Sequence, residues 1–146
     1  MIPATPVPAL DLPPVRQFPV VSQYMTDAPH TIAPSRSLAA ARGEMQHHRI
    51  RHLPVLDGGR VVGLLSERDL LLVETLPGVK PTDVRVEEAM AQEVFTVQPD
   101  APIGEVIEQM IARKLGSAVV CRDERVVGVF TTIDALRVLH ALLEHP

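Results

Sequence analysis

Two segments of this 146-residue chain match each other without a gap at an offset of 65 residues, the distance from Val21 to Val86. Identical positions in the first segment include Val21, Met25, Thr31, Pro34, Met45, Val55, Arg60, Val61, Val62, Gly63 and Asp69. Their counterparts are Val86, Met90, Thr96, Pro99, Met110, Val120, Arg125, Val126, Val127, Gly128 and Asp134. Chance does not hold one register over about fifty residues, so the chain contains two copies of one supersecondary unit.

Each copy begins with a short extended piece, at 31–32 or 96–97, followed by a helix. In the second copy we expect Gly116 to end that helix. The apolar face of this helix is expected to comprise Ile103, Val106, Ile107, Met110 and Ile111.

Two short apolar strands follow in the first copy, at 53–56 and 61–65. The intervening Asp57-Gly58-Gly59 predicts a tight hairpin, because aspartate and glycine tolerate the backbone angles of such turns. A second helix is predicted to start at Ser66. The order of elements in a copy is therefore strand, helix, strand, strand, helix.

About fifty residues cannot enclose a core that is stable on its own. We therefore predict an α/β fold in which two tandem β-α-β-β-α repeats pack sheet to sheet about a pseudo-twofold axis. The expected boundaries are 1–19 for an extended proline-rich arm, 20–76 for the first repeat, 77–84 for a linker, and 85–146 for the second repeat with its C-terminal helix.

Composition excludes several classes of protein. No apolar run approaches the roughly 18 residues that cross a bilayer, and prolines interrupt the N-terminus where a signal peptide would be apolar, so we expect a cytoplasmic protein. The single cysteine, Cys121, excludes an intrachain disulfide and a cysteine-based zinc site. A net charge of −4 and few aromatic residues argue against nucleic-acid binding.

The order of motifs resembles a tandem pair of CBS domains, the regulatory repeat also called a Bateman module. The resemblance rests on Met25-Thr26, Thr31-Ile32, HRIRHLPVLD at 48–57, GLLSERDLL at 63–71, KLGSAVV at 114–120 and GVFTTIDAL at 128–136. It implies two clefts between the repeats that bind adenine nucleotides or adenosyl compounds, and a module that dimerises into a flat disc. It is similar to stand-alone bacterial pairs, which carry no attached enzyme.

A hydroxyl and a carboxylate stand three residues apart where a strand becomes a helix, at Ser66 and Asp69 and again at Thr131 and Asp134. A carboxylate accepts two hydrogen bonds and so matches the vicinal hydroxyls of a ribose, while the hydroxyl and free N–H groups at a helix start suit a phosphate. The same pattern is also a capping box that needs no ligand. One aspartate can serve both roles.

An adenine ring needs a flat apolar slot, and the resemblance places it at 31–32 with 53–54 and at 96–97 with 118–119. Ordinary core packing is the alternative for these residues. Pro54 cannot donate a strand hydrogen bond, so its strand is expected at an edge, with backbone groups left for a ligand. In total, the candidate nucleotide-binding residues are Thr31, Ile32, Arg49, His52, Leu53, Pro54, Ser66, Arg68, Asp69, Thr96, Val97, Lys114, Ser117, Ala118, Thr131, Thr132 and Asp134.

The copies differ in charge. The first carries Arg49, Arg51, His52 and Arg68 where the second has Lys114, Gly116, Ser117 and Ile133. We hypothesise that the cleft of the first motif suits a polyphosphate, and that the cleft of the second suits a nucleoside, a monophosphate or an adenosylmethionine-like ligand. Solvated surface charge is the alternative for each arginine.

Catalytic and metal chemistry have little support. His47, His48 and His52, with His30 nearby, do not have the spacing of a tetrahedral site. Cys121 falls in an apolar strand, where a small inert side chain is expected. Because no nucleophile elbow, phosphate-binding glycine loop or dinucleotide fingerprint occurs, we expect no enzyme and no required cofactor.

The helices carry more apolar surface than one buried face needs. The surplus lies at Leu70, Leu71, Leu72, Val73 and Leu76 and, on the last helix, at Ile133, Leu136, Val138, Leu139, Leu142 and Leu143. It predicts a twofold homodimer, unless helices of one chain or the N-terminal arm cover it. We therefore expect a regulatory module that senses AMP, ADP, ATP or S-adenosylmethionine for an unidentified protein partner. The alternatives are a ligand-free scaffold and a weak nucleotide hydrolase or transferase.

Overall fold

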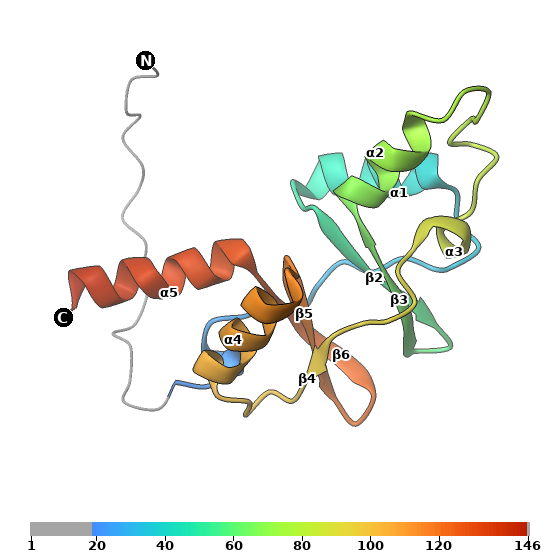
Figure 1. The fold of residues 1–146 in the computed structure, drawn as a ribbon. Coiled ribbons are helices and arrows are strands. Elements are labelled where there is room, and N and C mark those ends of the chain that lie inside the picture. The colour runs from blue at the N-terminus through green and yellow to red at the C-terminus, as the bar shows by residue number, and fades with distance from the viewer. Residues whose placement is uncertain (1–18, 146) are drawn as a thin grey trace, which may run out of the picture.

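The computed structural model describes residues 19–145, so all of the predicted arm except Pro19 lies outside the described residues. The first repeat contributes α1 (Leu38–His48), β2 (His52–Asp57), β3 (Arg60–Ser66) and α2 (Glu67–Glu74). The second contributes β4 (Thr96–Val97), α4 (Ile103–Arg113), β5 (Ser117–Arg122), β6 (Arg125–Thr131) and α5 (Thr132–Glu144). Figure 1 shows these as two neighbouring halves, with helices outside the strands. The predicted α/β class and tandem repeat are confirmed.

Three short elements begin the repeats: the 3-10 helix η1 (Val21–Gln23) and β1 (Thr26–Asp27) in the first, and α3 (Val86–Ala89) in the second. The strand order in the second half is β1-β6-β5-β4. In the first half, β2 and β3 pair, and single bridges add Ala91 beside β3 and Ile32 beside β2. The two sheets are thus built on one plan, although Thr31-Ile32 forms only a bridge where β4 forms a short strand.

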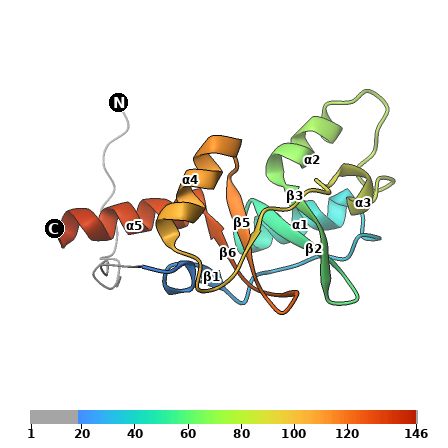
Figure 2. The ribbon, with the colours of Figure 1, turned by 60° about the horizontal axis from the view of Figure 1, so that its bottom comes forward.

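The first segment of each repeat, which we call its exchanged segment, packs on the other repeat. β1 pairs with β6, at the far end of the chain, and Figure 2 shows the two side by side. Val21 lies in one core with Val106 and Phe130 of the second repeat, whereas Val86 lies in the other core with Leu38 and Leu65 of the first. Neither core is complete without a segment from the opposite copy.

Glycines let these exchanged segments approach the strands. A Cβ atom on Gly128 would lie 3.0 Å from the Thr26 carbonyl oxygen and would overlap the Met25 side chain. Gly63 stands in the same relation to the Ala91 carbonyl oxygen, again at 3.0 Å, and to Met90. Only glycine fits at these repeated positions without displacing a neighbour.

Helix α4 ends earlier than expected. Lys114, not Gly116, follows the last helical residue in the left-handed conformation, with φ of 55°, and Arg49 has the same φ after α1. The prediction for Gly116 was wrong, because the left-handed conformation that ends these helices is taken by a lysine and an arginine. Gly116 instead leaves room for His52, whose Nε2 would lie 3.2 Å from a Cβ atom there.

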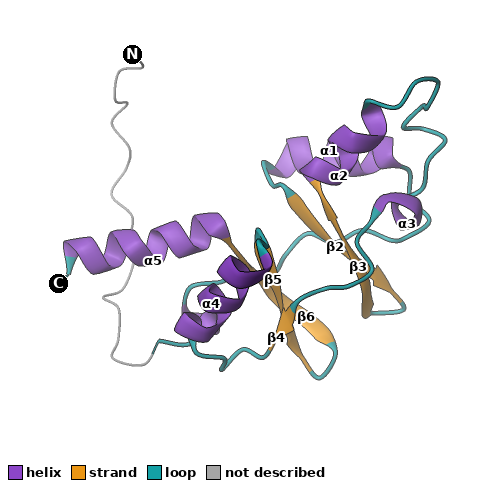
Figure 3. Ribbon diagram, in the orientation of Figure 1, coloured by secondary structure: helices purple, strands orange, loops and turns teal. Residues whose placement is uncertain are grey.

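The predicted apolar face of α4 is correct for Ile103, Val106 and Met110, which are buried, but wrong for Ile111, which is 72% exposed. Helix α5 projects away from the rest of the chain (Figure 3), and its exposed apolar residues include Leu136 and Leu143. Among the described helices, none is long and apolar enough to cross a membrane.

Candidate functional site

Asp134 sits in the first turn of α5 and completes a capping box. Its Oδ2 accepts hydrogen bonds from the Thr131 backbone N–H, at 2.9 Å, and from Thr131 Oγ1, at 3.2 Å. The Thr131 hydroxyl in return accepts from the Asp134 backbone N–H at 3.4 Å. The capping interpretation of this motif is therefore correct for the second repeat.

Further contacts cover the same carboxylate. Thr26, from the exchanged segment, donates through Oγ1 to Asp134 Oδ1 at 3.2 Å, and Arg137 lies one helical turn away with Nη1 3.5 Å from Oδ1. The residue is only 1% exposed. Asp134 thus ties the start of α5 to the segment that crosses from the first repeat.

Asp69 has the same cap but fewer partners. The Ser66 backbone N–H and Oγ both donate to its Oδ2 at 2.8 Å, and Oδ1 has no hydrogen bond to another described residue. The positions that correspond to Thr26 and Arg137 hold Ala91 and Leu72, which cannot bind a carboxylate. Asp69 is half-buried, so its free oxygen remains available to a ligand.

A cavity of about 560 Å³ opens beside Asp134 and is lined by both repeats. Its lining, which we call the Asp134 cleft, consists of Thr26, Asp27, Ala28, Pro29, His30, His48, Arg49, Ile50, Arg51, His52, Val129, Thr131, Thr132, Ile133, Asp134 and Arg137. Five candidate residues are brought together there: Arg49, His52, Thr131, Thr132 and Asp134.

The cleft pairs basic residues of the first repeat with the aspartate of the second. Arg49, Arg51 and His52 all line the Asp134 cleft. The structure thus places three basic residues of the first motif beside the aspartate of the second. The hypothesis on which cleft suits a polyphosphate stays a prediction. The three basic residues lie at or just before the start of β2. The exchanged segment β1 pairs with β6 and so brings the second repeat next to this part of the first.

Two histidines in this cleft form a contact that sequence reasoning missed. The rings of His30 and His48 stack with centroids 3.4 Å apart, and His48 Nε2 lies 3.2 Å from Glu44 Oε2. The residues are 18 positions apart, and their local patterns carry no signal of the contact. In residues 19–145, no group of three or more His, Cys, Asp or Glu side chains is arranged to hold a metal ion.

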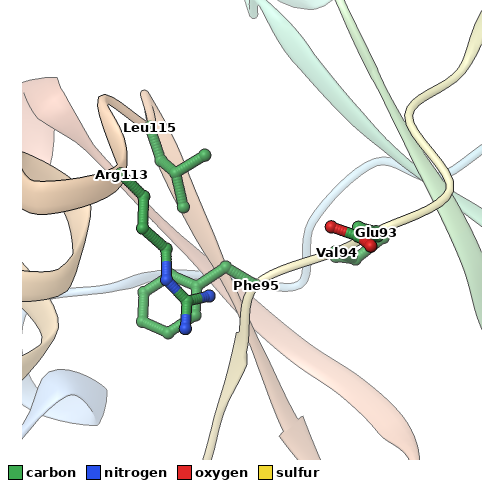
Figure 4. A pocket seen from close by; sticks show the side chains of 5 residues that line it. All are labelled: Glu93, Val94, Phe95, Arg113 and Leu115. Carbon is green, nitrogen blue, oxygen red and sulfur yellow. The ribbon is translucent and has the colours of Figure 1, made fainter.

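A second cavity, of about 470 Å³, is lined by Glu93, Val94, Phe95, Arg113 and Leu115. Each of these residues lies 65 positions after one in the Asp134 cleft, so this cavity corresponds to part of that cleft on the Asp69 side. The Arg113 guanidinium carbon lies 5.2 Å from the Phe95 ring centre. Figure 4 shows the guanidinium group next to the ring. This cation–π pair takes the place of the stacked histidines.

Several of the residues predicted to hold adenine lie in the hydrophobic cores and not in the cavities. Ile32, Leu53 and Ala118 belong to the two cores, and none of them lines either cavity. Pro54 is buried, and its carbonyl oxygen accepts a hydrogen bond from the Ile32 N–H at 3.1 Å. The expectation that backbone groups at Pro54 are left for a ligand was therefore wrong for this carbonyl group.

The other candidates stand apart from the cavities. Thr31, Arg68, Thr96 and Lys114 are exposed. Val97 packs against the second core. Ser117, at the start of β5, is buried, and its Oγ has no hydrogen-bond partner among the described residues.

The electrostatics of His52 reflect its place between the two repeats. Burial lowers the pKa of His52 below 6.5, and the negative charge of Asp69 opposes part of that shift. His52 lines the Asp134 cleft, while its strand partner is Ser66, the cap of α2. The residue therefore lies next to both aspartate motifs.

Comparison with known proteins defines the family. The family model for the CBS domain matches residues 21–74 and 86–141, so the chain belongs to the CBS-domain proteins and contains two tandem CBS domains. Hypoxic response protein 1 from Mycobacterium tuberculosis is 29% identical over 111 residues, which cover 74% of this chain and 78% of that protein.

Two solved structures are similar over most of their length. AcuB from Vibrio cholerae aligns with a TM-score of 0.78 and 30% identity, over 87% of this chain and 94% of that one. The CBS domain pair of protein MJ0100, solved in complex with 5'-methylthioadenosine and S-adenosyl-L-methionine, aligns with a TM-score of 0.77 and 26% identity, over 84% of this chain and 97% of that one.

Proposed function

We propose that this protein is a cytoplasmic regulatory module that binds an adenosine-containing ligand, such as AMP, ADP, ATP or S-adenosylmethionine, between its two CBS domains. Ligand binding then changes the geometry of the repeats and signals to a partner protein. Such a ligand acts only through its different affinities for two geometries. The module is regulatory and not catalytic.

The observation that carries this proposal is the repeated aspartate motif, together with two cavities whose linings correspond through the repeat and one of which contains Asp134. Asp69 offers a free carboxylate oxygen at the start of a helix, and Ser66 beside it adds a hydroxyl group. A ribose diol needs such an acceptor. The MJ0100 pair, which binds two adenosyl compounds, supports the ligand class.

Thermal unfolding with AMP, ADP, ATP, S-adenosylmethionine and GTP tests the proposal. A ligand at 100 times its dissociation constant stabilises a fold by about 2.7 kcal/mol, which is a readily measured shift. We expect at least one adenosine compound to raise the melting temperature, and Asp69→Ala to abolish that shift. Glu108→Ala, on the exposed side of α4, is the control. If no compound shifts the wild-type protein, the ligand-free scaffold becomes the better interpretation.

We also propose that two chains pair through the apolar residues of α5. Leu136 is 58% exposed and Leu143 is 71% exposed, on a helix that projects from the body of the chain. Light scattering coupled to gel filtration should give a dimer mass for the wild type and a monomer mass for the Leu136→Glu, Leu143→Glu double variant. A monomeric wild type at micromolar concentration would refute the pairing.

A further inference from the structure

Two stacked histidine rings form part of the wall of the Asp134 cleft. The rings of His30 and His48 have centroids 3.4 Å apart and planes inclined by 11°. His30 follows β1 on the exchanged segment, and His48 is the last residue of α1. The stack therefore connects the segment that packs on the second repeat with a helix of the first repeat.

The chain next to His30 is fixed at both ends and strained between them. On one side β1 pairs with β6, and on the other the Ile32 N–H donates to the Pro54 carbonyl oxygen at 3.1 Å. Ala28, between these two contacts, has a φ of 49°, a left-handed conformation that costs free energy in a residue with a side chain. Its counterpart in the second repeat, Glu93, does not have a positive φ. Loss of the stack would let this strained segment relax.

Protonation acts directly on the stack, because histidine changes its charge between about pH 8 and 5. His48 can hold a first proton, since its Nε2 lies 3.2 Å from Glu44 Oε2. A second proton, on His30, places two positive charges 3.4 Å apart. Even at the dielectric constant of water, their repulsion disfavours the stacked arrangement by about eightfold.

The surrounding charges do not offset this second proton. Besides Glu44, the charged or titratable residues that contact the rings or line the same cleft are Asp27, His47, Arg49, Arg51, His52, Asp134 and Arg137. Asp134 is contacted by Arg137. Among the residues that line the cleft, this leaves Asp27 as the one acid to oppose Arg49 and Arg51.

The second repeat makes the equivalent contact with a pair that does not titrate. Phe95 and Arg113 stand 65 positions after His30 and His48, and Figure 4 shows the guanidinium group next to the ring. A phenyl ring gains no proton, and a guanidinium group keeps its charge in proteins. Of these two equivalent contacts, only the histidine pair can respond to acid.

We propose that His30 and His48 form a pH-sensitive switch in the wall of the Asp134 cleft. At neutral pH the stack holds segment 28–31 against the end of α1. The separated rings bind more protons than the stacked rings, so separation is favoured as the pH falls towards 5. The inference does not depend on the proposed function, because it concerns the protein without a ligand.

Nuclear Overhauser effects between the two rings, measured on the ligand-free full chain, test the switch. We expect the effect between His30 and His48 at pH 7.5, and a ratio of separated to stacked rings about eightfold higher at pH 5.0. The Ala28 amide signal should follow the same pH dependence. The His30→Phe, His48→Arg double variant carries the pair of the second repeat, so its Ala28 signal should not respond. His47→Gln, which removes an adjacent histidine outside the stack, is the matched control and should respond as the wild type.

An effect of equal intensity between the rings at both pH values would overturn the switch. A double variant whose Ala28 signal still responds as in the wild type would also overturn it, because another group, such as His52, would then cause the change. If the double variant does not fold, His30→Gln replaces it with the same expected loss of response. His30 is exposed, so this change leaves both cores intact.

Discussion

The two copies form the same hairpin turn with different residues in the left-handed backbone conformation. The hairpin of the first copy turns at Gly58 and Gly59, with φ of 58° and 83°. The second copy makes the same turn with Asp123 and Glu124, at φ of 51° and 66°. The glycine pair made the first turn predictable from sequence. The second turn could be predicted only from its match to the first copy, because a glutamate carries no local signal for a left-handed conformation.

His52 makes the fold sensitive to acid. Burial lowers its pKa below 6.5, so just below pH 6.5 the unfolded chain binds more protons at this residue than the folded chain does. The contribution of His52 to stability is therefore full above pH 6.5 and falls as the pH drops through the range between 6.5 and the folded pKa.

We expect the free energy of unfolding to decrease less between pH 7.5 and 5.5 in His52→Gln than in the wild type. Urea unfolding at both values measures the difference. His140→Gln, which changes an exposed histidine on α5, is the control and should behave as the wild type. An equal decrease in His52→Gln and the wild type would show that burial of this ring does not affect the acid response.

At the scale of elements, local patterns predicted the helices and hairpins but not their partners. Short apolar runs and the Asp-Gly-Gly turn indicated β2 and β3, and Ser66 marked the start of α2. The exchange of β1 onto β6 left no such mark, because pairing between residues about one hundred positions apart depends on tertiary packing. For the same reason, the sequence did not predict that Arg49, Arg51 and His52 of the first repeat line the Asp134 cleft.

The glycine in β6 is expected to decide whether β1 can dock. Gly128→Ala places a methyl group against the Thr26 carbonyl and Met25, so we expect it to destabilise the protein by about 1–3 kcal/mol, as overpacking of a core does. Gly43→Ala is the control: its helix α1 position is open, and alanine there should stabilise by about 0.5–1 kcal/mol. Urea unfolding measures both. A neutral Gly128→Ala would mean that the β1 segment has room to shift.

For the whole molecule, the exchanged segments predict that both halves unfold together. Val21 is fully buried in the core of the second half, and Val86 in that of the first. Loss of either half exposes part of the other core. We therefore expect one calorimetric transition, with equal calorimetric and van't Hoff enthalpies, in the monomeric Leu136→Glu, Leu143→Glu variant. Adding Val21→Ala should lower this single melting temperature, whereas two separate transitions would contradict the coupling.

The crossing of β1 and α3 also bears on how such a chain arose by duplication. A single ancestral repeat on this plan would lack the segment that closes its own core, since that segment packs on the other copy. A half-length chain would therefore fold only by trading its first residues with a twin, as a domain-swapped pair. Fusion of two such genes would turn an association that depends on concentration into a permanent one, and would free each half to diverge, as the stacked His30 and His48 in one half and the Phe95–Arg113 pair in the other show.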